Sequence, residues 1–321
     1  MQRRQWIQCA AAAASTALLP SLRADNKIMR IVLPYSPGGI IDVLTRILTP
    51  SMSKTLNRTI IVENKPGAAG LVAVRAVQNA RPDAGLTVMV QNISFIGMPY
   101  MQKIANYDPM KDFTPIAMMG EGPGFIYVHG SVPAKNIAEF IAWAKTQPNG
   151  VEAATAGAGG GGHTWTLLLA KKAGINLLAV PYKGGAEMTT ALMTGEAKIM
   201  ISTATEALNG QVRAGKLKLI GVTSDRPSAL APGVPVVADT VPGYVISGWL
   251  SFFGQANMAQ EDVQSVSKAV QIALAEPGVK ERFTGLFAEV RYEGPAELAV
   301  SMRKVDEFYQ RLVADLGIVP Q

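Results

Sequence analysis

The residues best suited to binding chemistry lie in two glycine-containing stretches. The first is Pro34-Tyr35-Ser36-Pro37-Gly38-Gly39, which joins the apolar run 29–33 to a segment with apolar residues at helical spacing. A strand there passes into a helix, whose first amides lack intrahelical partners and carry the positive end of the helix dipole. Glycine also lets a ligand approach the backbone. The stretch therefore predicts free backbone amides that bind a carboxylate or a phosphate, with Ile40 opening the helix.

Asp42 falls in the first turn of that expected helix. A carboxylate there interacts favourably with the dipole of its own helix but repels an incoming anion. We therefore interpret Asp42 as a brace for the loop.

The second stretch is Thr155-Ala156 with the glycine-rich run 157–162 and His163, again between an expected strand and an expected helix. The glycines match G-x-G-x-x-G, but no Asp or Glu follows about 20 residues later to bind a ribose hydroxyl. No Gly-Lys-Ser/Thr follows either, which excludes a Walker-type phosphate loop. A second amide-lined helix start remains, for an anion or a carbonyl oxygen. His163 is either a ligand contact or a structural hydrogen-bonding group.

Residues for catalysis are scarce in this sequence. Its only histidines are His129 and His163, its one cysteine is Cys9, and neither H-E-x-x-H nor G-x-S-x-G occurs. We therefore predict no catalytic residue, no metal and no cofactor. A pair of carboxylates from distant segments cannot be recognised in sequence, so a hydrolase or transferase using the same site is the competing hypothesis.

Alternating strands and helices must position the two stretches. Strands are expected at 29–33, 59–64 and 86–90, and the alternation predicts a mostly parallel sheet covered on both faces. Pro50 falls late in the first helix and should kink or divide it. The segment 106–113 is rich in turn-forming residues.

The composition breaks at 120–124, and a second alternating unit then begins. We predict an α/β protein of two doubly wound lobes with a ligand cleft between them. Lobe 1 is expected to comprise 25–122, lobe 2 to comprise 123–248, and 249–321 to return to lobe 1 with helices that lack strands of their own.

The first 24 residues have the features of an export signal. Arg3 and Arg4 precede the mostly apolar run 7–19, and a small residue, Ala24, closes the segment. We predict a cleaved signal peptide over 1–24, exported by the Sec or the twin-arginine route. Cleavage would remove Cys9, which excludes disulfides, and would lower the formal net charge from +6 to +3. No cluster of Lys and Arg is dense enough for a nucleic-acid surface.

Several segments spread over nearly the whole chain match one known pattern. They are 34–39 with Asp42, 62–70, 107–109 with 111–113, 157–163, 180–184, 214–217, and 222–224 with 234–235. Together they closely resemble the extracytoplasmic solute receptors of tripartite tricarboxylate transporters, also called Bug receptors.

The resemblance implies a type II periplasmic-binding-protein fold and a monomer in the periplasm that delivers a small carboxylate to a membrane permease of two subunit types. In such receptors two loops hold one ligand carboxylate, largely through backbone amides and bridging waters. Carried onto this chain, the implied contacts are Tyr35, Ser36, Gly38, Gly39 and Ile40 in lobe 1, and Thr155, Ala156, Gly157 and His163 in lobe 2.

Departures from the family pattern bear on the ligand. Many relatives have Asp-Asn where this chain has Ser202-Thr203, so a carboxylate that could pair with a substrate amine is missing. Relatives often have Thr-His where this chain has Ser94-Phe95, so an aromatic face would enter the cleft unless Phe95 is a core residue. Ser94, Phe95 and Thr203 join the candidates, with Tyr182 from the matching segment 180–184.

We therefore expect a carboxylate without an amine, either a phthalate-type aromatic acid or, as the broader default, a plain dicarboxylate. A third hypothesis, beside transport and catalysis, is a sensory receptor that presents its closed form to a membrane kinase.

Overall fold

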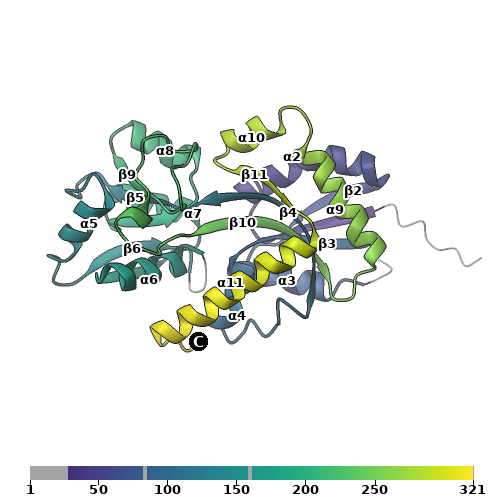
Figure 1. Cartoon of the computed structure of the whole chain (residues 1–321), viewed down its shortest axis with the longest axis horizontal. Coiled ribbons are helices and arrows are strands. Elements are labelled where there is room, and N and C mark those ends of the chain that lie inside the picture. Colours follow the sequence, from purple (N-terminus) through teal and green to yellow (C-terminus); the bar gives the residue numbers. More distant parts are fainter. Residues whose placement is uncertain (1–27, 82–84, 158–160, 321) are drawn as a thin grey trace, which may run out of the picture.

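The computed structural model describes residues 28–81, 85–157 and 161–320. The expected signal segment 1–24, with Cys9, lies outside the described residues. Figure 1 shows two parts side by side along the long axis, each built on its own β-sheet. We call the part on the first sheet lobe 1 and the part on the second sheet lobe 2.

Lobe 1 contains a six-stranded sheet in the order β11-β4-β10-β3-β1-β2. Its strands are β1 (Ile28–Leu33), β2 (Thr59–Asn64), β3 (Leu86–Asn92), β4 (Phe113–Pro123), β10 (Ser247–Gln255) and β11 (Glu289–Glu293). Its helices are α2 (Ile40–Leu56), η1 (Ala68–Gly70), α3 (Leu71–Gln78), α4 (Ser94–Met101), α9 (Gln260–Leu274), α10 (Val279–Gly285) and α11 (Pro295–Leu316). The central strand β3 is apolar and almost wholly buried, as a strand covered on both faces requires.

Lobe 2 contains a five-stranded sheet in the order β7-β6-β8-β5-β9. Its strands are β5 (Phe125–His129), β6 (Val151–Thr155), β7 (Leu177–Pro181), β8 (Ile199–Ser202) and β9 (Leu217–Val222). Its helices are α5 (Ile137–Ala144), α6 (Gly161–Ala173), α7 (Gly185–Thr194), α8 (Glu206–Arg213) and η3 (Val237–Asp239).

Both sheets are mixed, which corrects the expectation of mostly parallel pairing. β1 pairs in parallel with β2 and β3, and β6 pairs in parallel with β7 and β8. β10 pairs antiparallel with β3 and β4, while β5 pairs antiparallel with β8 and β9. β5 and β10 are the strands by which the chain enters lobe 2 and returns to lobe 1, and an alternating sequence pattern does not reveal their direction.

Two crossings connect the lobes, at Gly124 and near Ile246, and the buried Thr223 joins them. The Thr223 hydroxyl accepts a hydrogen bond from the Gly124 amide (2.8 Å) and donates one to the Ile246 carbonyl (2.6 Å). The Thr223 amide and carbonyl bond to the same two residues. One residue of lobe 2 therefore fixes both crossings at the point where the lobes meet.

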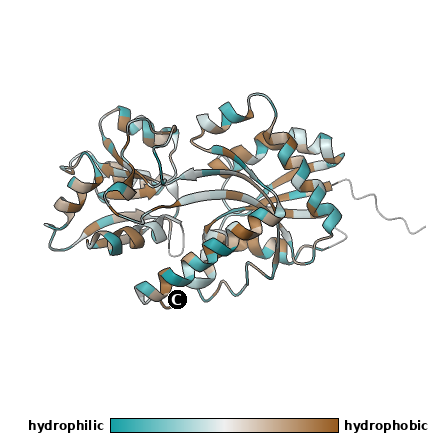
Figure 2. Ribbon diagram, in the orientation of Figure 1, coloured by the Kyte–Doolittle hydropathy of each residue, from teal (hydrophilic) through white to brown (hydrophobic). Residues whose placement is uncertain are grey.

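Apolar faces of the helices cover both sides of the lobe 1 sheet (Figure 2). On one side Leu44 and Leu48 of α2 are fully buried in a cluster with Val266 and Val270 of α9. Each such side chain contributes about 1.5–3 kcal/mol to folding. The cluster on the other side includes α4, α11 and Trp165 of lobe 2, so the core is continuous from one lobe to the other.

Helix α2 runs unbroken through Pro50, where we expected a kink or a division. Proline lacks the amide that would bond to the Arg46 carbonyl four residues earlier. The Thr49 hydroxyl donates to that carbonyl instead (3.0 Å). A local side chain thus replaces the missing hydrogen bond.

The C-terminal segment contains a strand, β11, which corrects the expectation that its helices lack one. β11 is short and carries three charged residues, so its sequence does not resemble a buried strand. Arg291 forms ion pairs with Glu121 of β4 (2.6 Å) and with Glu293 (2.7 Å), which supports the edge of the sheet.

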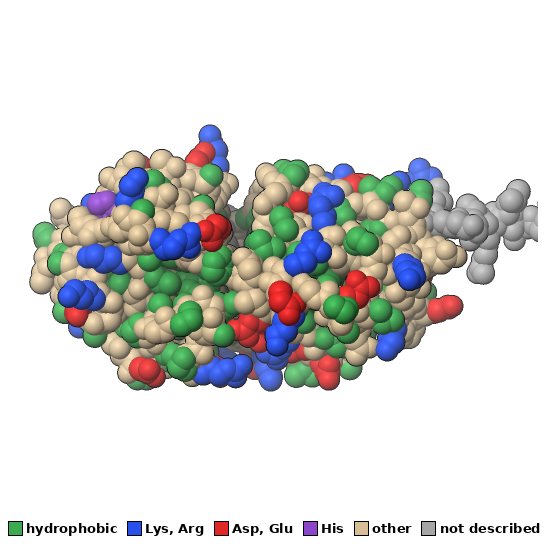
Figure 3. Space-filling model, turned by 90° about the horizontal axis from the view of Figure 1, so that it is seen from above, with side chains coloured by type: hydrophobic (Ala, Val, Ile, Leu, Met, Phe, Trp, Pro, Cys, Tyr) green, Lys and Arg blue, Asp and Glu red, His purple; other side chains and the backbone are tan. Residues whose placement is uncertain are grey.

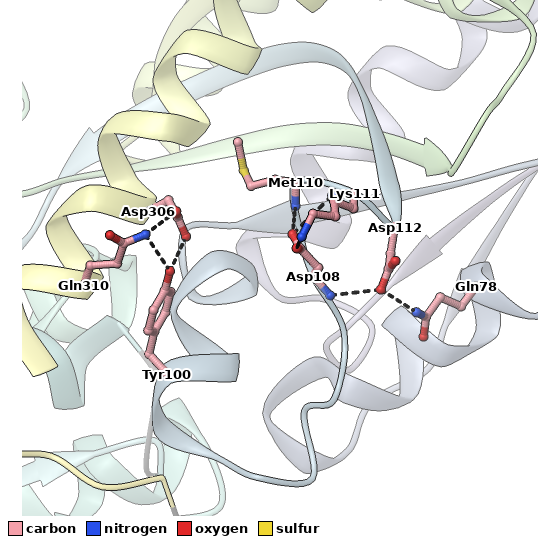
Figure 4. Close-up of polar contacts among 8 residues, drawn as sticks. All are labelled: Gln78, Tyr100, Asp108, Met110, Lys111, Asp112, Asp306 and Gln310. Atoms are coloured by element: carbon pink, nitrogen blue, oxygen red, sulfur yellow. Dashed lines mark hydrogen bonds and ion pairs between the residues drawn. The ribbon is translucent and has the colours of Figure 1, made fainter.

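The turn-rich segment before β4 is held by two carboxylates (Figure 4). Asp108 accepts hydrogen bonds from the amides of Met110 (2.9 Å) and Lys111 (3.2 Å), and Asp112 accepts one from the Asp108 amide (2.9 Å). Gln78 of α3 also donates to Asp112 (3.3 Å). Asp108 and Asp112, which belong to the segments that carry the resemblance, therefore stabilise a turn.

The same view shows how α11 is fixed to lobe 1. The Tyr100 hydroxyl of α4 donates to Asp306 of α11 (2.6 Å), and Gln310 donates to both (Figure 4). At its other end α11 reaches lobe 2, where Lys171 of α6 lies 3.6 Å from the Asp315 carboxylate and donates to the Asp315 carbonyl (2.6 Å). Among the described residues, no helix is both long and apolar enough to cross a membrane.

Candidate functional site

The first predicted loop ends at the start of α2, with Gly39 as a cap residue that offers no side chain. Residues 35–39 are exposed, and Gly38 has a left-handed φ of 81°. The Gly38 amide donates to the Asp42 carboxylate (3.0 Å), so that amide is not free as we expected. The amides that helix geometry leaves without an intrahelical partner are those of the first turn of α2, from Ile40 onward.

Asp42 braces this loop, as we predicted. Its carboxylate is almost buried and accepts from Gly38, from Arg46 (2.9 Å) and from Asn64 (3.0 Å). Burial alone would raise the pKa of Asp42, but these hydrogen bonds and the Arg46 charge outweigh it, so the pKa is lowered. Asn64 also donates to the Tyr35 carbonyl (3.0 Å), which ties the loop to the end of β2.

The Tyr35 side chain is held by Asn92, which ends β3. The Asn92 amide nitrogen donates to the Tyr35 hydroxyl (3.0 Å), and the Asn92 amide oxygen accepts from the backbone N–H of Ser94 (2.9 Å). Burial raises the pKa of Tyr35, although the hydrogen bond from Asn92 opposes this, while 37% of the residue remains accessible. The Tyr35 side chain is thus held by a hydrogen bond and remains open to solvent.

The second predicted loop opens α6 in lobe 2, and its residues 158–160 lie outside the described residues. Ala156 is exposed and Gly157 is partly exposed, as ligand contacts require. A Cβ added at Gly162 would lie only 2.8 Å from the Ile201 carbonyl oxygen, so α6 begins directly against the end of β8. His163 is half-buried, and burial lowers its pKa, which keeps the imidazole neutral at pH 7.

A short chain of contacts links the start of α6 to the first loop. A Cβ added at Gly161 of lobe 2 would lie 3.6 Å from the Ser94 Oγ of lobe 1, and Ser94 contacts Asn92, which contacts Tyr35. Figure 3 shows the surface notched between the lobes. The start of α6 therefore lies against the start of α4, two hydrogen bonds away from Tyr35.

Tyr309 of α11 is fully buried, and its ring contacts Gly97 of α4. Burial raises the pKa of Tyr309 to about 12, the Thr164 side chain of lobe 2 lowers it, and Tyr35 raises it further. A residue of the C-terminal helix thus packs against α4 in the core.

Phe95 lies in the core, which corrects its place among the ligand contacts. It is 1% exposed and stacks on Tyr107 (5.4 Å between ring centroids), with Phe113 at 5.1 Å and Phe253 at 5.0 Å. The apolar helix α4 turns this ring away from the cleft into the aromatic cluster, whereas Ser94 beside it faces lobe 2.

Thr155 and Tyr182 use their side chains within lobe 2. The buried Thr155 hydroxyl donates to the Val180 carbonyl (3.2 Å), and the Thr155 carbonyl accepts from the Tyr182 amide (2.8 Å). The Tyr182 hydroxyl donates to Glu196 (2.8 Å), and its ring lines a shallow pocket with residues of α7. Neither side chain joins the group around Tyr35.

Thr203 lies partly exposed after β8, next to Ile201, against which α6 begins. Its carbonyl accepts a hydrogen bond from the Ser202 hydroxyl (3.0 Å). The segment after β8 thus carries two small, partly exposed hydroxyl side chains. Within the described residues, no group of His, Cys, Asp and Glu is arranged to hold a metal ion.

Sequence reasoning missed the roles of Asn92 and Thr223. Asn92 lies two residues before Ser94, and its position at the end of a strand was the available signal. Thr223 lies in the matched segment 222–224, but nothing local to it indicated contacts with both crossings.

Comparisons with known proteins identify the family and the fold. Residues 44–303 match the family model described as "Tripartite tricarboxylate transporter family receptor". The chain is 30% identical over 327 residues to the UPF0065 protein in the gbd 5′ region of Cupriavidus necator, covering 99% of each chain.

Two solved structures share the whole fold. The periplasmic binding protein BugD superposes with a TM-score of 0.81 at 29% identity, covering 92% of this chain and 99% of that one. MatC from Rhodopseudomonas palustris with bound malate superposes with a TM-score of 0.79 at 28% identity, covering 89% of this chain and 98% of that one.

Proposed function

This chain belongs to the tripartite tricarboxylate transporter receptor family, and from that premise we propose that it binds a small carboxylate between its lobes for a membrane permease. Membership of this family makes the chain a solute receptor. What we propose are its ligand, the residues that contact the ligand, and the permease as its partner.

The observation that carries the proposal is the chain of contacts that joins two helix starts. The first turn of α2 begins after a cap residue without a side chain, and α6 begins beside Ser94, which is linked through Asn92 to Tyr35 in the loop before α2. A helix start carries the positive end of the helix dipole and can bind an anion, so two such starts suit one carboxylate. The proposed amide contacts are those of Ile40 in lobe 1 and of Ala156 and Gly157 in lobe 2.

A plain dicarboxylate is the proposed ligand class. The malate bound to MatC supports it, because MatC shares this fold over almost its full length. The burial of Phe95 removes the reason to favour an aromatic acid. The hydroxyl residues Ser202 and Thr203 leave no carboxylate at that position for an amine, which disfavours an amino acid.

Closure of the cleft would link binding to transport. A ligand that contacts both lobes stabilises the closed form relative to the open one, and that difference is what a permease can recognise. We propose that the receptor acts in this way as a periplasmic monomer.

Isothermal titration calorimetry with malate, succinate, benzoate and aspartate tests the proposal. We expect one of the two dicarboxylates to bind with 1:1 stoichiometry and to be recovered unchanged by mass spectrometry. Tight binding of aspartate would overturn the ligand class, and turnover of a bound acid would overturn the receptor function.

A further inference from the structure

We propose that Asn92 is a positioning residue that makes the Tyr35 hydroxyl a hydrogen-bond donor to the ligand, so that the cleft prefers a carboxylate to the corresponding amide. The inference rests on the proposed function, because it concerns the ligand bound in that cleft. It adds a residue that the two loops do not contain.

The orientation of the Asn92 side chain is fixed by the backbone. The N–H of Ser94 can only donate, so the atom of Asn92 that lies 2.9 Å from it must be the amide oxygen. The amide nitrogen then faces the Tyr35 hydroxyl at 3.0 Å. The Ser94 amide therefore decides which end of Asn92 meets Tyr35.

The orientation of Asn92 sets the role of Tyr35. A phenol oxygen that accepts a hydrogen bond from Asn92 keeps its own proton for another partner. The hydroxyl stays protonated at neutral pH, because burial raises the pKa of Tyr35. Since Tyr35 remains partly accessible beside the lobe interface, its proton is available to a ligand in the crevice.

The Tyr35 hydroxyl, as a hydrogen-bond donor, discriminates between ligands by the group that each ligand presents to it. A carboxylate offers a charged acceptor to the Tyr35 proton in either orientation. A primary amide has only its neutral carbonyl oxygen for that proton, and both groups are left unsatisfied if its NH₂ group faces Tyr35. Sites that bind a polar group by a fixed hydrogen bond reject analogues without the matching group strongly. We therefore expect Tyr35 and Asn92 to act together.

The substitution Asn92→Asp tests the inference. An aspartate can still accept from the Ser94 amide, but it must also accept the Tyr35 proton, which turns the lone pairs of Tyr35 toward the ligand. The probes are malate, succinate and benzoate, each compared with the analogue in which every carboxylate is replaced by a primary amide. The measured quantity is the ratio of the Kd of the amide to the Kd of the acid.

We expect Asn92→Asp to lower this ratio at least 10-fold. The added negative charge alone also disfavours an acid. To measure that effect, Asn92→Asp is also made in the Tyr35→Phe background. There we expect the ratio to change by about 3-fold or less, since charges near solvent interact weakly. Asn209→Asp is the matched control in lobe 2: it adds the same charge and keeps the acceptor for the Tyr127 hydroxyl. It should leave the ratio unchanged.

The outcomes separate the inference from the proposed function. If the wild-type protein binds none of the three acids, the proposed function is overturned and this inference with it. Suppose instead that the wild type binds an acid, but Asn92→Asp changes the Kd ratio by the same factor whether position 35 is Tyr or Phe. In that case only the inference is overturned. Thermal unfolding of each variant verifies that the fold is retained.

Discussion

The two sides of the cleft present the same kind of group, a helix start, but they hold it in different ways. In lobe 1 the loop before α2 is held by side chains, chiefly Asp42, Asn64 and Asn92. In lobe 2 the start of α6 lies against the carbonyl of Ile201, at a distance that only glycine permits. One side depends on hydrogen bonds and charge, and the other depends on the absence of a Cβ.

Because the starts of α2 and α6 are held in different ways, they should respond to different substitutions. Removing a charge should disturb lobe 1 most, whereas adding a methyl group should disturb lobe 2 most. The experiments below test that contrast in order of expected effect.

The largest effect is expected for Asp42→Ala. The substitution leaves the Gly38 amide, Asn64 and the Arg46 guanidinium without their shared acceptor, and we expect the free energy of unfolding to fall by about 3 kcal/mol. Affinity for a carboxylate should fall with it. Urea denaturation measures the first and calorimetry the second.

Asp262→Ala is the matched control, because Asp262 also lies in a first helical turn but makes a partly exposed ion pair with Arg58. Its loss should lie below about 1 kcal/mol. Equal losses for the two substitutions would show that the loop does not depend on its buried brace.

Gly162→Ala should have the next largest effect. The new Cβ would meet the Ile201 carbonyl oxygen at 2.8 Å, a backbone atom that cannot swing aside, and overpacking of this kind costs about 1–3 kcal/mol. Urea denaturation of the neighbouring Gly161→Ala is the comparison, since that Cβ would have its nearest neighbour at 3.5 Å. If both alanines are tolerated alike, close backbone packing does not hold this side.

Thr223→Val should lower the free energy of unfolding by a smaller amount. It affects both crossings, so it should not favour one helix start over the other. It keeps the shape of the side chain but leaves the Gly124 amide and the Ile246 carbonyl without the hydroxyl, at a cost of about 1–2 kcal/mol. The measurement is again the urea midpoint. Thr189→Val, at an exposed helical threonine that bonds to the Gly185 carbonyl, should cost less than about 0.5 kcal/mol.

The smallest effect is a difference in pH dependence. The pKa of His163 and the pKa of Asp42 are both lowered in the folded protein, so each group adds stability that is present at high pH and lost as the pH falls. For His163 the loss begins below its ordinary value of 6.5, and for Asp42 it begins below 3.8.

Urea midpoints measured from pH 8 to pH 3 test this separation. His163→Asn should remove the upper part of the decline, and Asp42→Asn should remove the lower part. A single transition that neither substitution alters would contradict it.

Much of this arrangement could be predicted from sequence. Both glycine loops and the brace at Asp42 were visible because strand, turn and helix follow one another locally. The free amide expected at Gly38 was wrong because the same carboxylate that braces the loop also bonds to that amide. Local patterns thus located both loops and the Asp42 brace correctly, but they did not indicate the hydrogen bond between Gly38 and Asp42.

Other errors came from contacts between distant segments. The sequence around Phe95 could not indicate that Phe113 and Phe253 would surround its ring. The direction of β5 and β10 likewise depends on how the chain crosses between the lobes. These features follow from tertiary packing, which residue spacing does not encode.

The helix α11 has a practical consequence. It is anchored to lobe 1 through Asp306, yet its last turn is held by Lys171 of lobe 2. Separation of the lobes would lengthen the distance between residues 171 and 315 before it disturbed either sheet. Two fluorescent dyes at these positions would therefore convert the receptor into an optical sensor for its own solute.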